Sequence, residues 1–354
     1  MAINLHAKYE KKLAEAYTRS SFVAGNASSE FEFTGVKSIK IPSIVTKPLG
    51  DYDRTPNNEY FRYGTPADVQ DTVQEMSMTQ DKSFALVVDK GDNSEQQLMK
   101  NAGTVMKAEI EEQVVPHIDK YVLAKWCNEA GMVKTFASAL TKTTVVSAIL
   151  DAETYFSDNF VPDGERYLYI KSDQFSLLRL APEWTGCDKL TKEIVKRGYI
   201  GDIASFKVIR VPASYLPAGV YFLAVQKKSV LAPQKIRDAK VHQDPPGISG
   251  ALLEGRYNFD AFVIGARCSG VYVACAEDNA CAEPAATKGA TTSLATETAG
   301  ASIKYTLDGS DPRYSASAAV YTGAFANPDA GVVIKAYAYK TGLLPSTVLT
   351  HTCV

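Results

Sequence analysis

The stretch NSEQQLMKNAGTVMKAEIEEQVVPHIDKYVLAKWCNEAG, residues 93–131, has the pattern of one long helix with both ends marked. Asn93 or Ser94 can cap its N-terminus, and Gly131 stands where a left-handed residue would end it. At about 1.5 Å per residue, this helix would be longer than most globular domains need. Its apolar residues recur mostly at four-residue steps and form a single stripe: Leu98, Met106, Ile110, Val114, Ile118, Val122 and Trp126.

Pro116 lies inside this pattern and predicts a kink. Because its ring removes one amide donor and crowds the carbonyl group four residues back, we expect the bend near Glu112. A long, kinked helix with one apolar stripe is typical of a spine laid along a flat subunit rather than of a helix bundle.

The segment before the helix does not have the pattern of a self-sufficient domain. Residues 1–34 contain a short amphipathic helix, with Tyr9, Leu13 and Tyr17 at four-residue steps, followed by small polar residues. Such a segment could not bury enough surface to stay folded alone, so we interpret it as an N-terminal arm that lies on something else.

Residues 35–92 predict an extended β-hairpin loop. Alternating residues around 39–45, interrupted by Pro42 and Pro48, indicate one strand, and MTQDKSFALVVDKGD (78–92) indicates a second. The stretch between them is polar and rich in turn residues. An isolated hairpin of this size is marginal in water, so a neighbouring subunit would have to cover it. An edge hairpin on the chain's own sheet is the alternative.

The rest of the chain up to residue 275 mixes helices and strands, which indicates an α+β body. We expect a helix over 143–159, a strand at RYLYI (166–170), a helix capped by Ser172 and Asp173, and a strand over 206–211. Two long strands around a Gly/Pro-rich turn follow within 235–275.

The C-terminal region changes character. Residues 276–300 are rich in Ala, Thr and Gly and predict a linker. Residues 301–354 predict a small all-β sandwich, with a start near 283 left open. Its expected strands are Ile303–Leu307, Ala319–Tyr321, Val332–Tyr339 and Thr347–His351.

Composition excludes several classes of protein. The 38 basic and 40 acidic residues nearly cancel, so no overall basic surface for nucleic acid is implied. No run of eighteen apolar residues predicts a membrane span, and residues 1–21 lack the apolar core of a signal peptide, so we expect synthesis in the cytosol. The six cysteines contain no C-x-x-C pair. Cys281 and Cys353 bracket the last module and could be bridged, although free thiols are favoured.

No catalytic pattern stands out, so we predict no catalytic, cofactor-binding or metal-binding residues and no enzyme activity. The four histidines are far apart in sequence, and no P-loop, G-x-S-x-G, H-E-x-x-H or dinucleotide fingerprint occurs. The carboxylate pairs Glu111/Glu112 and Asp51/Asp53 are of a kind that usually faces water. DGSDP (308–312) lacks the further ligands of a calcium loop, and a tight turn whose Asp side chains bond backbone amides explains it better.

Two stretches, EEQVVPHIDKYVLAKW (111–126) and VPDGERYLYIKSDQFSLL (161–178), together with the order of elements over residues 1–275, resemble the major capsid protein of tailed bacteriophages. The resemblance implies a Hong Kong 97-type fold. In it, 1–34 would be the N-terminal arm, 35–92 the extended loop, and 93–275 the peripheral and axial domains. Within the body, 93–142 and the strands near 205–275 would be peripheral, and much of 143–204 axial.

This resemblance implies a structural protein that self-assembles as hexamers and pentamers into an icosahedral phage head enclosing double-stranded DNA. Its implied partners are portal, scaffolding and head-completion proteins, with assembly in the host bacterial cytoplasm. Some family members cross-link neighbours through a lysine. Lys40 and Lys47 lie on the expected loop, but no matching acceptor motif is evident, so that chemistry is not carried over. Basic residues of the arm could contact DNA, although a solvated helix face is favoured: Lys8, Lys11, Lys12 and Arg19.

A second resemblance covers about 283–354. IKYTLDGSDPRYSASAAVYTG (303–323) and VVIKAYAYKTGLLPS (332–346) resemble the immunoglobulin-like module at the C-termini of chitobiases and β-hexosaminidases. That module carries no catalytic residues there. On a shell it would project outward and touch host-surface glycans or add bulk, and bulk is favoured. The alternative for the whole chain is a carbohydrate-binding surface protein built around this module.

Overall fold

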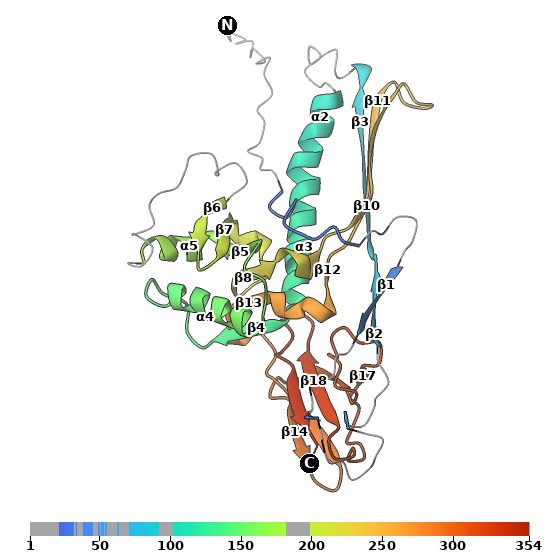
Figure 1. Cartoon of the computed structure of the whole chain (residues 1–354). Coiled ribbons are helices and arrows are strands. Elements are labelled where there is room, and N and C mark those ends of the chain that lie inside the picture. The colour runs from blue at the N-terminus through green and yellow to red at the C-terminus, as the bar shows by residue number, and fades with distance from the viewer. Residues whose placement is uncertain are drawn as a thin grey trace. The chain divides into compact units, whose positions relative to one another are not determined.

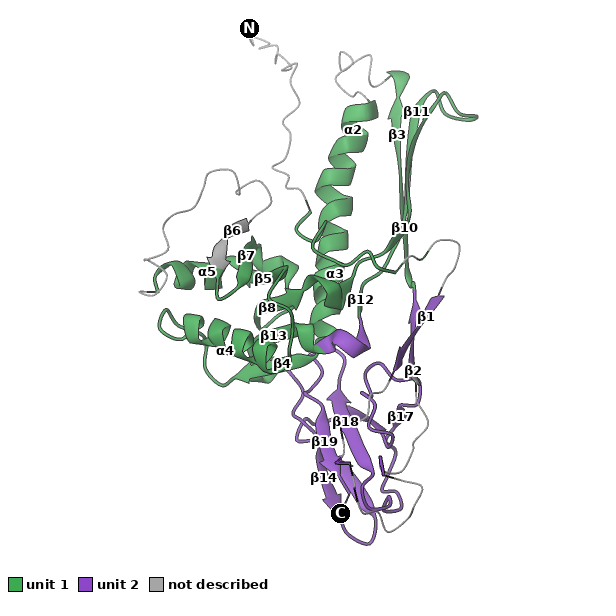
Figure 2. Ribbon diagram, in the orientation of Figure 1, with its two compact units in different colours: residues 1–35, 78–263, 269–279 green, residues 36–77, 264–268, 280–354 purple. Residues whose placement is uncertain are grey.

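The computed structural model describes residues 21–31, 33, 38–44, 49, 51–52, 54, 62–63, 71–91, 102–181 and 199–353. The chain is divided into two compact units (Figure 2). Unit 1 comprises residues 1–35, 78–263 and 269–279, and unit 2 comprises residues 36–77, 264–268 and 280–354. Several predicted features lie outside the described residues: the arm helix with Lys8, Lys11, Lys12 and Arg19, the helix caps Asn93 and Ser94, and Lys47.

The long helix of unit 1 is present, with a π-helical turn inside it. Helix α2 (Ala102–Glu109), the π turn η1 (Ile110–Val114) and α3 (Val115–Asn128) follow one another without a break (Figure 1). The N–H of Val115 donates to the carbonyl of Ile110, five residues back. Pro116 has no amide hydrogen to offer to Glu112, so the irregularity expected near Glu112 takes the form of a π turn.

The predicted left-handed end at Gly131 is wrong. The helix ends at Asn128, Glu129 has φ −105° and ψ 17°, and Gly131 is not among the glycines with positive φ. Tertiary contacts hold this end instead. Oε2 of Glu129 accepts the N–H of Val263 at 3.0 Å, and Oε1 lies 2.9 Å from Nζ of Lys125. Burial raises the pKa of Glu129, with Lys125 acting in the opposite direction.

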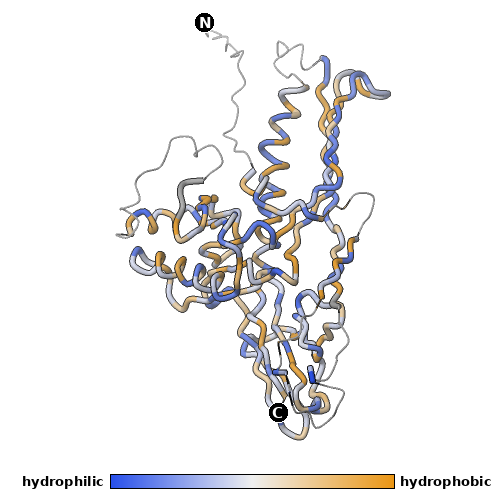
Figure 3. The backbone as a smooth tube through the Cα atoms, in the orientation of Figure 1, coloured by the Kyte–Doolittle hydropathy of each residue, from blue (hydrophilic) through white to orange (hydrophobic). Residues whose placement is uncertain are grey.

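A three-stranded antiparallel sheet lies beside the first half of this helix (Figure 1). Its order is β10 (Gln234–Gln243), β11 (Gly250–Phe259) and β3 (Gln80–Asp89). Hydrophobic and hydrophilic residues alternate around α2 and along these strands (Figure 3). The apolar sides meet in a small core of Val88, Met106, Ala251 and Leu253, as expected for an amphipathic helix on one face of a sheet.

The predicted hairpin over 35–92 is wrong in its pairing. The first strand, β1 (Ser38–Ile44), pairs with β2 (Asp71–Ser77), whereas the strand expected at 78–92 is β3 and pairs with β11. The alternation in DTVQEMS was masked by the turn residues before it, yet Met76 is buried and lies opposite Ile39. Alternation marks a strand but carries no information about which distant strand will be its partner.

A six-stranded mixed sheet forms the second core of unit 1 and confirms the helix expected over 143–159 and the strands over 166–170 and 206–211. Helices α4 (Val145–Asp158) and α5 (Ser172–Arg179) pack their apolar residues on one face. On the opposite face, Trp126 of α3 lies 6.3 Å from the ring of Tyr169. The strand order is β4 (Met132–Phe136), β13 (Val271–Ala276), β8 (Val220–Gln226), β5 (Arg166–Lys171), β7 (Phe206–Val211), β6 (Tyr199–Ile203).

The predicted cap by Ser172 is wrong, because its hydroxyl donates to the carbonyl of Val211 at 3.0 Å and Lys171 occupies the N-cap position. The remaining short elements of the body are η3 (Ala213–Tyr215), η4 (Lys227–Ser229), β9 (Val230–Leu231), β12 (Phe262–Val263), η5 (Gly265–Gly270) and η6 (Glu277–Asn279). None of the described helices is long and apolar enough to cross a lipid bilayer.

The C-terminal module of unit 2 contains a four-stranded sheet in the order β17 (Ala319–Val320), β16 (Ser302–Thr306), β18 (Val333–Tyr339), β19 (Leu349–Thr352). These strands confirm the four predicted ones. Of the two starts left open for this module, the one near 283 fits the structure and the linker prediction is wrong over 285–295. There β14 (Ala285–Lys288) and β15 (Thr292–Ala295) form a hairpin, and Leu294 is buried in the module's core. Cys281 and Cys353 are both buried free thiols.

Candidate functional site

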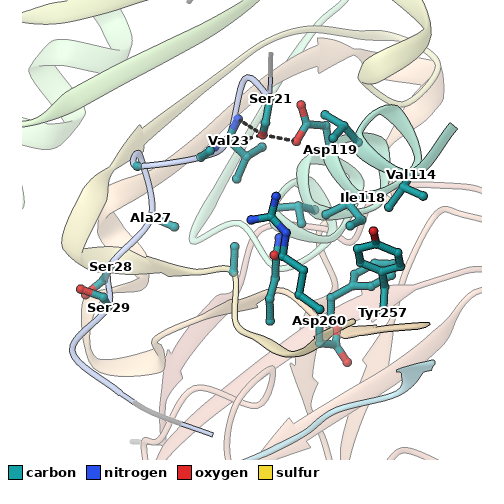
Figure 4. Close-up of a pocket in the computed structure, with 18 of the residues that line it drawn as sticks. Ser21, Val23, Ala27, Ser28, Ser29, Val114, Ile118, Asp119, Tyr257 and Asp260 are labelled. Atoms are coloured by element: carbon teal, nitrogen blue, oxygen red, sulfur yellow. Dashed lines mark hydrogen bonds between the residues drawn. The ribbon is translucent and has the colours of Figure 1, made fainter. Parts of the chain in front are cut away.

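A pocket of about 540 Å³ lies in unit 1, between residues 21–29, the π turn with α3, and strands β10 and β11 (Figure 4). It is the natural place to look for chemistry, since it contains two buried carboxylates, Asp119 and Asp260.

Asp119 tethers the N-terminal segment to helix α3. Its Oδ1 accepts the hydroxyl of Ser21 at 2.6 Å (Figure 4). Its Oδ2 accepts the N–H of Phe22 at 2.7 Å. Burial raises the pKa of Asp119, while these two hydrogen bonds act in the opposite direction. The bonds therefore offset part of the cost of burying the charge. Further along, Asn26 donates to the carbonyl of Phe22, and the ring of Phe33 stacks on that of Phe262 at 5.6 Å.

Asp260 joins three distant segments of unit 1. One oxygen accepts the N–H of Thr79 at 2.8 Å and its hydroxyl at 2.9 Å. The other oxygen accepts the hydroxyl of Tyr121 and the N–H of Ala261, both at 2.8 Å. The side chain is 1% exposed. It therefore fixes the start of β3 and helix α3 to the corner between β11 and β12.

The hydrogen bonds of both carboxylates are made within unit 1. Every oxygen of Asp119 and Asp260 already accepts at least one hydrogen bond from the protein. Asp119 and Asp260 thus fix distant segments of unit 1 to one another, and we interpret the pocket as a gap between these segments.

The residues considered for chemistry in the sequence are dispersed. His117 lies edge-on to the ring of Phe259, and His242 on β10 faces Glu254 at 3.3 Å. His351 is on β19 in unit 2, and His6 lies outside the described residues. Among the residues that the structure describes, no three of His, Cys, Asp or Glu gather as metal ligands.

The charge pairs considered in the sequence have ordinary surface environments. Lys40 pairs with Glu75 across β1 and β2 at 3.8 Å, both exposed. Glu111 pairs with Lys107 along the helix at 3.8 Å, and Asp53 lies outside the described residues.

The DGSDP segment confirms the predicted turn. Oδ1 of Asp308 accepts the N–H of Ser310 at 2.9 Å, and Oδ1 of Asp311 accepts the N–H of Arg313 at 2.9 Å. Aspartates that bond backbone amides two residues on are a standard turn device.

Strand β10 gives unit 1 an exposed sheet edge. Of its ten residues only Ile236 is partly buried, and four charged residues lie along it: Lys235, Arg237, Asp238 and Lys240. Among the described strands, β10 has a partner on one side only. Unpaired edges attract other strands, and charged side chains, lysine above all, limit unspecific pairing. This edge is therefore a surface suited to a specific neighbour rather than to indiscriminate pairing.

Phe160 is the least expected residue on the surface of unit 1. It has φ 55°, in the left-handed region, and its side chain is 94% exposed. Helix α4 ends there with the N–H of Phe160 on the carbonyl of Ser157 and the N–H of Val161 on that of Phe156. Glycine is the usual residue at this point of such an ending. A phenylalanine here has a strained backbone and exposes its ring without benefit to the isolated subunit.

Sequence reasoning missed Asp119, Asp260 and Phe160. A signal was available for Asp260, because it interrupts the apolar stretch FDAF (259–262), where a charge must be buried with partners. No local sequence pattern predicts the contact between Asp119 and Ser21, because the two residues are 98 positions apart.

Comparison with solved structures shows what this fold is similar to. The chain is similar to a structure from Mycobacterium phage Che8, with a TM-score of 0.63 and 17% identity, covering 77% of this chain and 98% of that one. It is also similar to the mature capsid of bacteriophage PhiM1, with a TM-score of 0.58 and 12% identity, covering 78% of this chain and 93% of that one. A third similar structure is the capsid of cyanophage P-SCSP1u, with a TM-score of 0.57 and 11% identity, covering 77% of this chain and 93% of that one.

Comparison by sequence reaches less of the chain. The profile of a family described as "Fn3 associated" matches residues 293–353. No curated protein matches the chain. The similarities to solved structures confirm the predicted fold class, a mixed α+β fold shared with phage capsid structures, followed by an all-β C-terminal region.

Proposed function

We propose that this chain is the major capsid protein of a tailed bacteriophage and that many copies assemble into the shell. The observation that carries this proposal is the fold, which matches phage capsid structures over 77% of the chain and nearly all of theirs. The joints built around Asp119 and Asp260 suit a subunit whose long elements must keep a fixed geometry.

Two surfaces of unit 1 support assembly. The edge of β10 and the ring of Phe160 are both exposed. Subunit interfaces commonly contain an aromatic side chain at the centre of a contact. We infer that both surfaces contact further copies of this chain.

The proposed roles of the segments follow the sequence, with the loop revised. Residues 1–34 would form the arm, 93–275 the peripheral and axial domains, and the ladder of β1 and β2 the base of the extended loop. Copies would close into hexamers and pentamers through heterologous contacts. The icosahedral head would enclose double-stranded DNA, with portal, scaffolding and head-completion proteins as partners. Assembly would take place in the host bacterial cytoplasm, and the chain would have no enzymatic role.

The test is assembly of the purified protein. Light scattering and electron microscopy should show capsomers or closed shells at some salt, pH and protein concentration. A compact monomer that persists under every assembly condition would contradict the proposal.

A second role, binding of host-surface glycans by the C-terminal module, has less support than simple decoration. Sugars stack on open ring faces, but the rings of Tyr305 and Phe325 stack on each other at 4.9 Å, and Tyr321 is edge-on to both. A glycan array probed with the whole chain decides between them. A flat signal would leave the module as decoration, and a single strong glycan class would make it a receptor-binding device.

Replacement of Pro116 by alanine is expected to leave the subunit folded and to change shell size or yield. The ring fixes the position of the irregularity between α2 and α3, so its loss should alter the helix geometry more than the stability. Circular dichroism of dispersed subunits checks folding, and electron microscopy checks the particles. Unchanged particle size and yield would remove Pro116 from any role in assembly.

A further inference from the structure

The DGSDPRY turn (308–314) has so far no function, yet it is one of the most heavily bonded loops of unit 2. Asp308 accepts the N–H of Ser310 at 2.9 Å and the hydroxyl of Ser317 at 2.7 Å. The guanidinium group of Arg313 donates two hydrogen bonds to Asp311. Its Nε lies 3.0 Å from Oδ1, and its Nη2 lies 2.6 Å from Oδ2. A fork of two charge-assisted hydrogen bonds, largely removed from water, holds a loop in one geometry.

This turn presents Tyr314 to another part of unit 2. A Cβ added to Gly265, in the turn η5, would lie 2.9 Å from Cβ and 3.0 Å from Cγ of Tyr314. The N–H of the same glycine donates to Oε1 of Gln74 on β2 at 2.7 Å. The same virtual Cβ would lie 3.2 Å from that oxygen. Gly265 is thus in close contact with the C-terminal module on one side and with the β1–β2 ladder on the other.

Space, not backbone conformation, requires glycine at this point. Gly265 is not among the glycines with positive φ, so its backbone would accept other residues. Cβ contacts shorter than about 3.0 Å essentially do not occur, so any side chain would push Tyr314 away from η5. A second contact lies next to it, where Sγ of Cys268 is 4.0 Å from Oδ2 of Asp311.

We propose that the 308–314 turn docks the C-terminal module onto the chain's own β1–β2 ladder, through Gly265, and that the module acts as a brace for that ladder. A two-stranded ladder is marginally stable by itself. Tyr314 of the module packs on Gly265, which in turn donates its N–H to Gln74 of the ladder. The docking stands on these contacts alone. Only its consequence, a loop held in position for a neighbouring subunit, rests on the proposed capsid function.

The variant Gly265→Val in the full chain tests the brace by hydrogen–deuterium exchange. Overpacking of a close contact opens it measurably, so amides of residues 71–77 and of 308–315 should both exchange about tenfold faster or more. Amides of β16 and β18 in the module, and of β3 and β11, should keep their rates. The matched control is Gly323→Val in the same module, because a Cβ there meets nothing within 4 Å; its exchange should equal that of the parent chain.

Faster exchange confined to 308–315, with 71–77 unchanged, would overturn the brace. If Gly265→Val loosens β3 and β11 as well, Gln74→Ala decides, since it removes the acceptor without adding volume. That variant should accelerate exchange across β1 and β2 several-fold, and an unchanged rate would again overturn the proposal. Exchange is measured on dispersed subunits, so it is independent of assembly. A chain that never assembles contradicts the capsid function and leaves the brace intact.

Discussion

Replacing Asp260 by alanine is expected to lower the free energy of unfolding by about 3 kcal/mol. The substitution removes the acceptor of the N–H groups of Thr79 and Ala261 and of the hydroxyl of Tyr121, around a residue that is only 1% exposed. Unpaired polar groups in such an environment carry the full cost of their desolvation. Denaturant unfolding of dispersed subunits, followed by tryptophan fluorescence, measures the loss.

Two further variants sharpen the result. Asp260→Asn keeps the shape and one acceptor oxygen, so about half of the loss is expected. Asp238→Ala removes an exposed carboxylate of β10 that pairs with Lys240 and should change stability by less than about 0.5 kcal/mol. A loss below about 1 kcal/mol in Asp260→Ala would show that the joint of Thr79, Tyr121 and Asp260 does not hold the three segments together.

Phe160→Gly is expected to change stability and assembly in opposite directions. Glycine adopts a φ of 55° without strain, so the free energy of unfolding should rise by about 1 kcal/mol. Loss of an exposed aromatic anchor should lower the assembled fraction, by about tenfold in the association constant of the subunit. Denaturant unfolding gives the first quantity and sedimentation of assembly reactions the second.

The matched variant is Phe160→Tyr, which keeps the ring and the strained backbone. It should have the stability of the parent chain and assemble nearly as well. If Phe160→Gly assembles as well as the parent chain, the exposed ring is not an interface residue. If its stability falls, the left-handed conformation at 160 is not the source of strain.

Helices and strands could be predicted from the sequence where apolar residues recur periodically. The stripe through Met106 and Trp126 predicted the long helix, and Pro116 located its irregularity. The strands of the C-terminal module were recognisable because turn residues separate them. These features depend on residues within one or two turns of each other.

Features that depend on distant residues were not readable. Nothing in residues 78–92 says that β3 pairs with β11 rather than with β1, because any apolar face satisfies the same alternation. Gly131 stands where a left-handed cap is common, but the helix ends at Asn128, next to a contact between Glu129 and the distant Val263. The tether at Asp119 depends on Ser21, which a local pattern cannot pair with it.

The same limit applies to the 308–314 turn. The prediction that Asp308 and Asp311 bond nearby amides is confirmed, since those contacts are two residues long. The close approach of Tyr314 to Gly265 could not be predicted from the sequence, because it depends on how the module packs on a segment 49 positions earlier.

The π turn at Ile110–Val114 has a geometric consequence for the apolar stripe. Residues spaced by four advance about 40° beyond a full revolution of an α-helix at each step, so a strict four-residue stripe winds around the helix. One turn closed by a bond from Val115 to Ile110 takes up an extra residue and unwinds the stripe by about 100°. The four-residue spacing from Met106 to Trp126 therefore fits a helix with one widened turn better than an unbroken α-helix. The π turn helps to keep these residues on one face of the helix.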